Sequence, residues 1–386
     1  MNQKNKNIFC AHQKKCGACQ LQNLSYADQL SWKMATVIKL LRSYGRVSEI
    51  IGMDTPYYYR NKVQAAFGTT ARGKMISGIY KSGTHTIVAT DSCYLENQTA
   101  DAIIVTIRKL AVSFGYSVYN EDTHTGFLRH VLVRTGDVTG QILVTLVTGT
   151  PVFPRKHDFI KALTARHPEI TTVVQNINNS STSMVLGERQ TVLYGKGYIE
   201  DELCGCRFRI SPKSFYQINH TQTEKLYGAA IDFADLQLGE TVIDAYCGIG
   251  TIGLVAAKSG CRVIGAEING EAVRDALVNK KINGAENAVF MKKDAGELMQ
   301  ELAAERAQID VVFTDPPRSG CSREFLAALC KLQPGRVVYI SCNPETQARD
   351  LRYLTAHGYK VRKIQPVDMF PHTRHIECVA LLTRSK

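Results

Sequence analysis

The chain has 386 residues, 44% of them hydrophobic, and carries a net charge of +12 with a pI of about 9.1. This length accommodates two or three domains, and no run of 18 apolar residues indicates a transmembrane helix. The polar, basic start is unlike a secretory signal, so we expect a cytoplasmic protein with no membrane association and no obligate protein partner. The positive charge favours a polyanionic partner, because lysine and arginine neutralise phosphates.

The first 50 residues are basic and contain three closely spaced cysteines. Eight Lys/Arg against two Asp/Glu give this segment a net charge of +6. Cys10, Cys16 and Cys19 belong to a total of 12 cysteines, and a disulfide framework is not expected in a reducing compartment. Some of the thiols are therefore expected to bind metal, some to act in catalysis and others to fill the core. A helical pattern follows from about Tyr26 to Tyr44.

The middle of the chain, residues 56–205, consists mainly of short alternating segments separated by Gly, Asn, Asp and Ser. Strands are expected at 62–67, 75–80, 84–89, 131–134, 142–147 and 172–177. Helical patterns near 98–114 and 156–166 interrupt them. The middle region therefore predicts an α+β domain.

After about residue 206, buried strands alternate with helices. A helix near 222–233 precedes strands at 241–245, 263–266, 288–291, 311–314 and 337–341. This rhythm is typical of a doubly wound, mostly parallel sheet, whose ligand sites lie at the carboxyl ends of the strands. We expect an α/β chain with a cysteine-rich region and helix (1–55, with Cys93), a central α+β domain (56–205) and a Rossmann-like domain (206–386).

A glycine-rich turn follows the strand at 241–245 and opens a helix. Gly248 and Gly250 allow the backbone to approach a ligand closely, and the helix start offers oriented N–H groups. Glu267 ends the next strand, where an acid can accept hydrogen bonds from ribose hydroxyls. Asp294 follows the strand after that, where an acid can meet an adenine amino group. A dinucleotide site has the same βαβ logic, but Asp-x-x-Cys-Gly-x-Gly is more typical of adenosylmethionine enzymes.

Two further motifs follow neighbouring strands. Asp315-Pro-Pro comes after the strand at 311–314, and its carboxylate is a suitable acceptor for a target amine, so methyl transfer to nitrogen is one interpretation. Cys342 comes after the strand at 337–341, and a cysteine at the active edge instead favours covalent catalysis. The segment 370–377 adds titratable groups: His372 and His375 are alternative proton carriers to Glu377.

Five segments together resemble the RNA 5-methyluridine methyltransferase family. They are SPKSFYQIN (211–219), DAYCGIGTIGL (244–254), TDPPRSG (314–320), SCNPETQARD (341–350) and FPHTRHIECV (370–379). They occur in the family's order and cover the carboxyl-terminal half. The resemblance implies a class I methyltransferase fold, S-adenosylmethionine as methyl donor and RNA as substrate.

The same resemblance implies roles for individual residues. Cys342 would be the nucleophile that adds to C6 of a uridine, and Glu377 would be the base that removes the C5 proton. The positions that match the family's cofactor contacts are Gln217, Tyr246, Thr251, Glu267, Asp294 and Asp315. Phe127 or Tyr216 are candidates for stacking on bases next to the flipped target.

Cys10, Cys16, Cys19 and Cys93 are similar to the family's four-cysteine metal set. Four thiolates suit either a [4Fe–4S] cluster or zinc, and the resemblance favours the cluster. Only nine residues precede Cys10, so the family's frequent RNA-binding barrel is not expected. This layout is most similar to the bacterial enzymes that act on 23S rRNA at uridine 747, whereas some archaeal relatives with this layout act on tRNA or rRNA.

Overall fold

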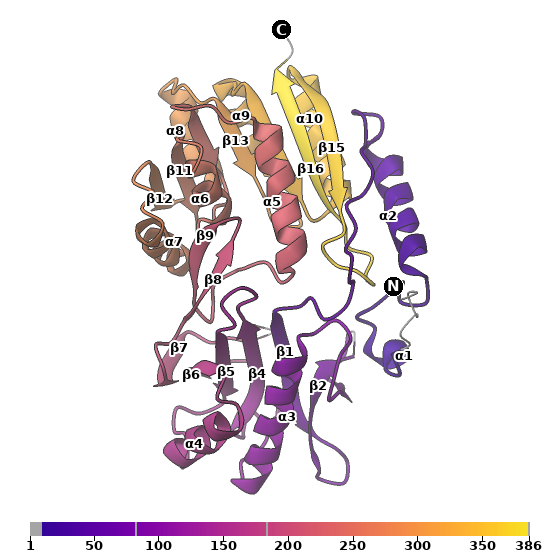
Figure 1. Cartoon of the computed structure of the whole chain (residues 1–386), viewed down its shortest axis with the longest axis vertical. Coiled ribbons are helices and arrows are strands. Elements are labelled where there is room, and N and C mark those ends of the chain that lie inside the picture. Colours follow the sequence, from indigo (N-terminus) through magenta and orange to yellow (C-terminus); the bar gives the residue numbers. More distant parts are fainter. Residues whose placement is uncertain (1–9, 82, 183, 385–386) are drawn as a thin grey trace. The chain divides into compact units, whose positions relative to one another are not determined.

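A computed structural model describes residues 10–81, 83–182 and 184–384 (Figure 1). The chain forms two compact units. The first contains the residues up to Asn23, Pro56–Glu202 and Arg209–Lys213, and the second contains Leu24–Thr55, Leu203–Phe208 and the residues from Ser214 onward. Within the described ranges, no helix is both long and apolar enough to cross a membrane.

The first unit is a seven-stranded sheet with two helices of more than ten residues. The strand order is β3-β2-β1-β4-β5-β6-β7, and only β5 and β6 pair in parallel. The elements are α1 (Gln13–Cys16), β1 (Lys62–Thr69), β2 (Met75–Tyr80), β3 (Ile87–Ala89), α3 (Gln98–Ser113), β4 (Leu128–Thr135), β5 (Ile142–Thr148), α4 (Lys156–Arg166), β6 (Ile170–Ile177) and β7 (Arg189–Tyr194). All the strands and helices expected between 56 and 205 therefore form.

The core of the first unit lies between its sheet and the helices α3 and α4. Ile103 and Ile107 of α3 are buried with Val131 and Val144 of the central strands. α3 begins at this place because Asn97 caps it: the Asn97 side chain accepts hydrogen bonds from two backbone N–H groups of the first turn.

The second unit is a seven-stranded, mostly parallel sheet with helices on both faces (Figure 1). The strand order is β12-β11-β10-β13-β14-β16-β15, and only β16 runs antiparallel to its neighbours. The elements are α2 (Tyr26–Leu41), α5 (His220–Ala234), β10 (Thr241–Asp244), α6 (Thr251–Ala257), β11 (Arg262–Glu267), α7 (Gly270–Ile282), β12 (Ala288–Lys292), α8 (Ala295–Ala304), β13 (Val311–Thr314), α9 (Arg323–Leu332), β14 (Arg336–Ser341), α10 (Pro344–Ala356), β15 (Tyr359–Val367) and β16 (Glu377–Arg384). This arrangement is the expected Rossmann-like fold. A separate hairpin of β8 (Ile199–Leu203) and β9 (Cys206–Ile210) is divided between the units.

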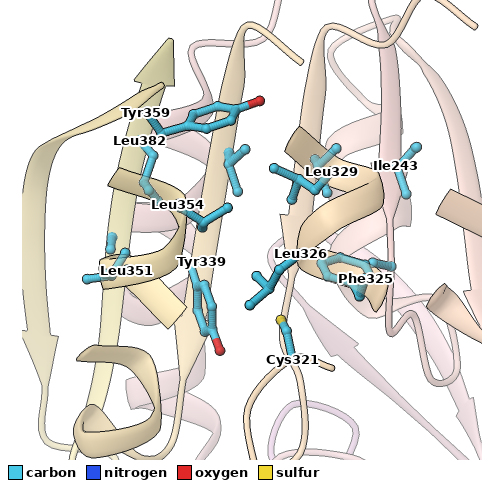
Figure 2. Packing of buried hydrophobic residues seen from close by; sticks show 14 of the residues in the cluster. Ile243, Cys321, Phe325, Leu326, Leu329, Tyr339, Leu351, Leu354, Tyr359 and Leu382 are labelled. Atoms are coloured by element: carbon cyan, nitrogen blue, oxygen red, sulfur yellow. The ribbon is translucent and has the colours of Figure 1, made fainter. Parts of the chain in front are cut away.

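Helix α2 differs from the expected grouping, which placed it with the cysteines in a region 1–55. Val37 and Leu41 of α2 are fully buried in the core of the second unit, together with Leu351 and Leu354 of α10. Figure 2 shows this core from close by, with side chains of α9 and α10 gathered over the sheet. The amphipathic pattern of 26–44 predicts a buried face, but it does not say which partner covers that face.

A buried ion pair fixes α2 to the segment directly after β15. The Lys33 ammonium lies 2.5 Å from an Asp368 oxygen, and both side chains are fully buried. The second Asp368 oxygen accepts a hydrogen bond from the Tyr26 hydroxyl at 3.0 Å, and Lys33 also donates to the Phe370 carbonyl at 3.0 Å. Burial lowers the pKa of Lys33 whereas Asp368 raises it, so the lysine depends on its partner to stay charged.

We expect Lys33→Met to lower the free energy of unfolding by about 3–5 kcal/mol, because it leaves Asp368 buried without its counter-charge. Urea unfolding measures the change. Lys39→Met, at an exposed position of the same helix, is the matched control and should cost less than about 1 kcal/mol. The double variant Lys33→Met/Asp368→Leu should recover most of the loss. Equal effects of the Lys33 and Lys39 substitutions would contradict this account.

Candidate active site

The sequence-predicted residues of the second unit gather at the carboxyl ends of its parallel strands. Asp244, Glu267 and Asp315 stand at or directly after the ends of β10, β11 and β13, and Cys342 follows β14. Because β11, β10, β13 and β14 are consecutive neighbours in the sheet, these ends form one edge. Ligands of doubly wound sheets bind at this edge, so the fold places the expected residues where chemistry can occur.

The register of two antiparallel strands brings Cys342 next to Glu377. β14 and β16 pair so that Ser341 lies opposite Cys378. Cys342 is one residue beyond Ser341 and Glu377 is one residue before Cys378, so the two residues face each other at the next position along this pair of strands. Glu377 is only 4% exposed, whereas Cys342 is partly exposed. A buried carboxyl group therefore lies behind an accessible thiol.

Three acidic groups share this small region. Burial, followed by the charges of Glu377 and Asp315, raises the pKa of Cys342 to about 11. Burial raises the pKa of Asp315 to about 7, and burial with Asp315 raises the pKa of Glu377 well above its usual value. In the free protein at neutral pH, the Cys342 thiol is therefore predominantly protonated. The sequence alone did not reveal how closely these groups influence one another.

Arg318 is the cation that opposes these shifts, and the sequence reading gave it no role. Its charge lowers the pKa of both Cys342 and Glu377. Its guanidinium Nη2 lies 3.3 Å from His375 Nδ1. Its backbone carbonyl accepts hydrogen bonds from the Asn343 amide and the Thr346 hydroxyl, each at 3.2 Å, which joins the loop after β13 to the start of α10.

Arg318→Gln should shift the pH dependence of Cys342 reactivity to higher pH, because the charge that lowers the pKa of Cys342 is removed. Alkylation of the Cys342 peptide by iodoacetamide, followed by mass spectrometry across a pH series, measures this shift. Arg374→Gln is the matched control: it removes an arginine that is not among the groups shifting Cys342. A midpoint that is unchanged, or moves to lower pH, would contradict the assignment.

The loop that carries Asp315 and Arg318 is closed by a buried carboxylate. Asp350 of α10 accepts hydrogen bonds from the Cys321 backbone N–H at 2.8 Å and the Tyr339 hydroxyl at 2.7 Å. Gly320 has a φ of +77°, and a Cβ there would lie 2.7 Å from an Asp350 oxygen. The loop therefore needs glycine at this position to reach Asp350.

The glycine turn after β10 has the geometry of a ligand cradle. Gly248 and Gly250 have φ of +55° and +85°, and a Cβ on Gly248 would meet no atom within 4 Å. One Asp244 oxygen accepts the Gly253 N–H at 2.8 Å, while the other is buried without a hydrogen bond from any described residue. Burial raises the pKa of Asp244 to about 7. Open space and an unsatisfied buried oxygen fit a bound polar molecule. The spacing Gly-x-Gly-x-x-Gly also occurs in dinucleotide sites, so the glycines alone do not identify that molecule.

Other expected cofactor positions surround this turn. Glu267 accepts hydrogen bonds from the backbone N–H groups of Gly248 at 3.2 Å and Asn269 at 2.8 Å. The ring of Tyr246 lies 5.7 Å from that of Phe325. The Thr251 hydroxyl, in the first turn of α6, lies 3.3 Å from the Tyr227 hydroxyl.

Two of the expected cofactor positions, Asp294 and Gln217, lie in other segments of the second unit. One Asp294 oxygen accepts two N–H groups of the first turn of α8, so this residue is a helix cap as well as a candidate ligand contact. Gln217 is partly exposed in the segment between β9 and α5, three residues after the second unit resumes at Ser214.

The structure corrects the interpretation of three side chains, Phe127, Tyr216 and His372. Phe127 is 6% exposed in the core of the first unit, and Tyr216 is 3% exposed with its ring 6.3 Å from Phe208, so neither presents a stacking face. Phe215, by contrast, is 68% exposed. His372 is buried against Gln29, whose amide contacts its ring nitrogen at 3.1 Å and its backbone N–H at 2.8 Å. His372 therefore stabilises the fold, whereas His375 lies beside Arg318.

In the first unit, the four expected metal-binding cysteines are partly buried and influence one another. Cys10 and Cys16 raise the pKa of Cys19, and Cys19 raises that of Cys93, so these thiols lie close enough to interact electrostatically. Mainly through burial, the pKa of Cys19 rises to about 11 and that of Cys93 to about 12. The Cys93 backbone N–H donates to Asp101 at 2.8 Å.

Comparisons with known proteins identify methyltransferases as relatives of this chain. A family model described as tRNA (uracil-5-)-methyltransferase matches residues 137–385. An uncharacterized RNA methyltransferase of Bacillus cereus is 41% identical over 384 residues, covering 98% of this chain and 83% of its own length. Another, from Clostridium acetobutylicum, is 42% identical over 382 residues, with 97% and 83% covered.

Among solved structures, the crystal structure of Pyrococcus abyssi tRNA (uracil-54, C5)-methyltransferase in complex with S-adenosyl-L-homocysteine superposes with a TM-score of 0.78. It is 29% identical and covers 95% of this chain and 85% of its own. The family match extends over more than half of the chain, and the relatives match almost all of it. The chain therefore belongs to the tRNA (uracil-5-)-methyltransferase family and is an S-adenosylmethionine-dependent enzyme that methylates uracil C5 in RNA.

Proposed function

We propose that this enzyme methylates one uridine of 23S rRNA, at a 747-type position, through a covalent bond between Cys342 and C6 of the base. The observation that carries the mechanism is the meeting of Cys342, Glu377 and Asp315 at one edge of the sheet. Uracil C5 is too poor a nucleophile to attack a sulfonium methyl group directly. A thiolate that adds to C6 converts the ring to an enolate, in which C5 is nucleophilic.

Each step uses a group that this edge supplies. The Cys342 thiolate forms the bond to C6, and C5 then takes the methyl group from S-adenosylmethionine. Glu377 accepts the proton from C5, and the electron pair of that C–H bond re-forms the C5–C6 double bond as the thiolate leaves. The carboxyl group of Asp315 is a hydrogen-bonding partner for the uracil edge or the cofactor. Asp315-Pro-Pro also suggests methyl transfer to an amino group. That reaction would need no covalent bond to Cys342, because an amino nitrogen is itself nucleophilic.

Burial and charge support these roles. The pKa of Cys342 lies near 11 in the free protein, so the step that forms the thiolate needs help, and Arg318 supplies the positive charge. Both Cys342 and Glu377 act in their deprotonated forms, and the pKa of each is raised. Activity is therefore expected to rise with pH across the neutral range.

S-adenosylmethionine supplies the electrophilic methyl group when bound. The residues that would hold it are those around the glycine turn. Glu267 would bind the ribose hydroxyls, Asp294 the adenine amino group, and Tyr246, Thr251 and Gln217 the remaining surface. The unsatisfied Asp244 oxygen and the open space beside Gly248 support this location.

The four-cysteine set fits a metal centre by its donor chemistry. Burial raises the pKa of Cys19 to about 11 and that of Cys93 to about 12, so these two thiols are protonated when free, and a metal centre would convert them to thiolate ligands. A [4Fe–4S] cluster is the proposed occupant, held by Cys10, Cys16, Cys19 and Cys93, and its role is to hold the basic amino-terminal segment in place. Methyl transfer itself needs no electron.

Protein purified without oxygen should contain about four iron and four sulfide per chain, with visible charge-transfer absorption. Cys16→Ser should lose most of this iron and absorption. Cys330→Ser, at a half-buried position in the core of the second unit, is the matched control and should keep both. A content of about one zinc per chain, with no sulfide, would contradict the cluster and show that the four cysteines bind zinc instead.

The RNA target rests on a narrower argument than the chemistry. The cysteine set resembles that of the ribosomal branch, whereas the family description and the Pyrococcus structure both name tRNA. Unmodified 23S rRNA and unmodified tRNA should therefore be incubated separately with the enzyme, and the modified position mapped. Modification of 23S rRNA alone supports the proposal, and modification of tRNA alone overturns the target while the chemistry stands.

A further inference from the structure

A groove of about 690 Å³ runs between α9 and α10 on the second unit. Its floor includes Cys321, Leu326 and Tyr353, and Figure 2 shows Cys321 and Leu326 close together below α9. Cys321 follows directly on the loop that carries Asp315 and Arg318. The groove therefore begins next to the reacting edge of the sheet, yet none of its lining residues has a role in the mechanism above.

The rim of the groove is basic. Arg323 of α9 and Arg349 and Arg352 of α10 line it, and all three are exposed. Asp350 is the one carboxylate in the lining, and it is fully buried and bound to the Cys321 N–H, the Tyr339 hydroxyl and Arg349. In the part of the chain that the structure describes, Arg323 and Arg352 form no ion pair and no side-chain hydrogen bond. Two cations thus face solvent at the edge of an apolar floor.

The far end of the groove carries a fixed aromatic platform. The rings of Tyr353 and His357 stack with centroids 4.1 Å apart and an interplanar angle of 19°. His357 Nδ1 also lies 2.7 Å from the Tyr353 carbonyl oxygen, which holds the imidazole in place. His357 is exposed, so a flat ring is presented beside the arginines. Basic side chains next to a rigid ring are the combination that binds single-stranded nucleic acid.

We propose that this groove binds the RNA substrate outside the target nucleotide, with Arg323 and Arg352 on backbone phosphates and His357 against a neighbouring base. The inference depends on RNA being the substrate, but on neither the choice of RNA nor the Cys342 mechanism. RNA is the occupant favoured by charge, because two unpaired arginines match a polyanion and the groove begins at the loop that contributes to the active site.

The test compares Arg323→Gln/Arg352→Gln with Arg274→Gln/Lys281→Gln, which removes two charges from exposed positions of α7. Dissociation constants are measured by filter binding between about 50 and 300 mM salt, using unmodified in vitro transcripts of 23S rRNA and tRNA. Two lost phosphate contacts should reduce the slope of log K against log salt by about 1.4–1.8, at 0.7–0.9 per contact. At the lower salt concentrations, the affinity of the Arg323→Gln/Arg352→Gln variant for RNA should fall about ten-fold or more. Its binding of adenosylmethionine should stay unchanged, which shows that the variant is folded.

Two further variants separate charge from stacking. Arg323→Lys/Arg352→Lys should keep the salt slope of the wild-type enzyme, because both charges remain. His357→Ala should weaken binding several-fold without changing the slope. A glutamine variant whose affinity and slope equal those of the α7 control overturns the proposal, and would leave the groove to a partner other than RNA.

Discussion

Cys342→Ala should lower kcat/KM for RNA methylation by at least about 10⁴-fold while adenosylmethionine binding remains within about two-fold of wild type. The loss is expected because no other thiol of the second unit combines a place at this edge with exposure: Cys247, Cys261, Cys321 and Cys378 are buried. Without the bond to C6, uracil C5 stays a poor nucleophile. Transfer of a labelled methyl group to RNA measures the rate, and equilibrium dialysis measures cofactor binding.

Cys330→Ala is the matched control for this variant, because Cys330 is partly exposed but lies on α9 away from the strand ends. It should retain activity within about two-fold. A Cys342→Ala enzyme that methylates RNA at more than about one-hundredth of the wild-type rate would contradict the covalent mechanism. Labelled amino groups in that RNA would point to the amino-transfer alternative.

Glu377→Gln is expected to trap the reaction after methyl transfer. The amide cannot take the proton from C5, so the Cys342 thiolate cannot leave and a methylated RNA–protein adduct accumulates. Turnover should fall by about 10²–10⁴-fold, the range of a lost general base. Burial already favours the neutral form of Glu377, so glutamine, which has the same shape and no charge, should disturb the fold little.

The adduct is measured by denaturing electrophoresis and by mass spectrometry of the Cys342 peptide. The control is Glu345→Gln, at an exposed position in the first turn of α10, which should turn over normally and trap nothing. Rapid turnover of Glu377→Gln without an adduct would remove Glu377 from the role of base. His375, 3.3 Å from Arg318, would then be the next group to test.

Much of the fold was predictable because its signals are local. The strand at 311–314 and the helix at 156–166 form with the expected bounds, since short apolar runs and helical periodicity depend on neighbours in sequence. Longer-range packing was not predictable. Whether Val37 of α2 contacts the first or the second unit depends on α10, more than 300 residues away, and a single helical pattern contains no such information.

In the candidate site, too, the residues could be identified from local sequence, whereas their contacts depend on long-range packing. Cys342 and Glu377 were both identified, but their proximity depends on the register of β14 against β16, which pairs residues 37 apart (Ser341 and Cys378). Two histidines of one short segment could not be told apart by sequence. His372 is buried by Gln29, 343 positions earlier, whereas His375 is beside Arg318. Phe127, directly before β4, was misassigned because the sequence around an aromatic residue does not show whether its ring faces a core or a ligand.

RNA that contains 5-fluorouridine tests the covalent mechanism most directly. Fluorine at C5 leaves no proton for Glu377 to remove, so the wild-type enzyme should stop after methyl transfer with the base still bound to Cys342. The predicted result is a complex that survives denaturation, forms only with S-adenosylmethionine, and yields a methylated 5-fluorouridine on the peptide carrying Cys342. Methylated RNA released without any adduct, or an adduct on another cysteine, would contradict the assignment of Cys342 as the nucleophile.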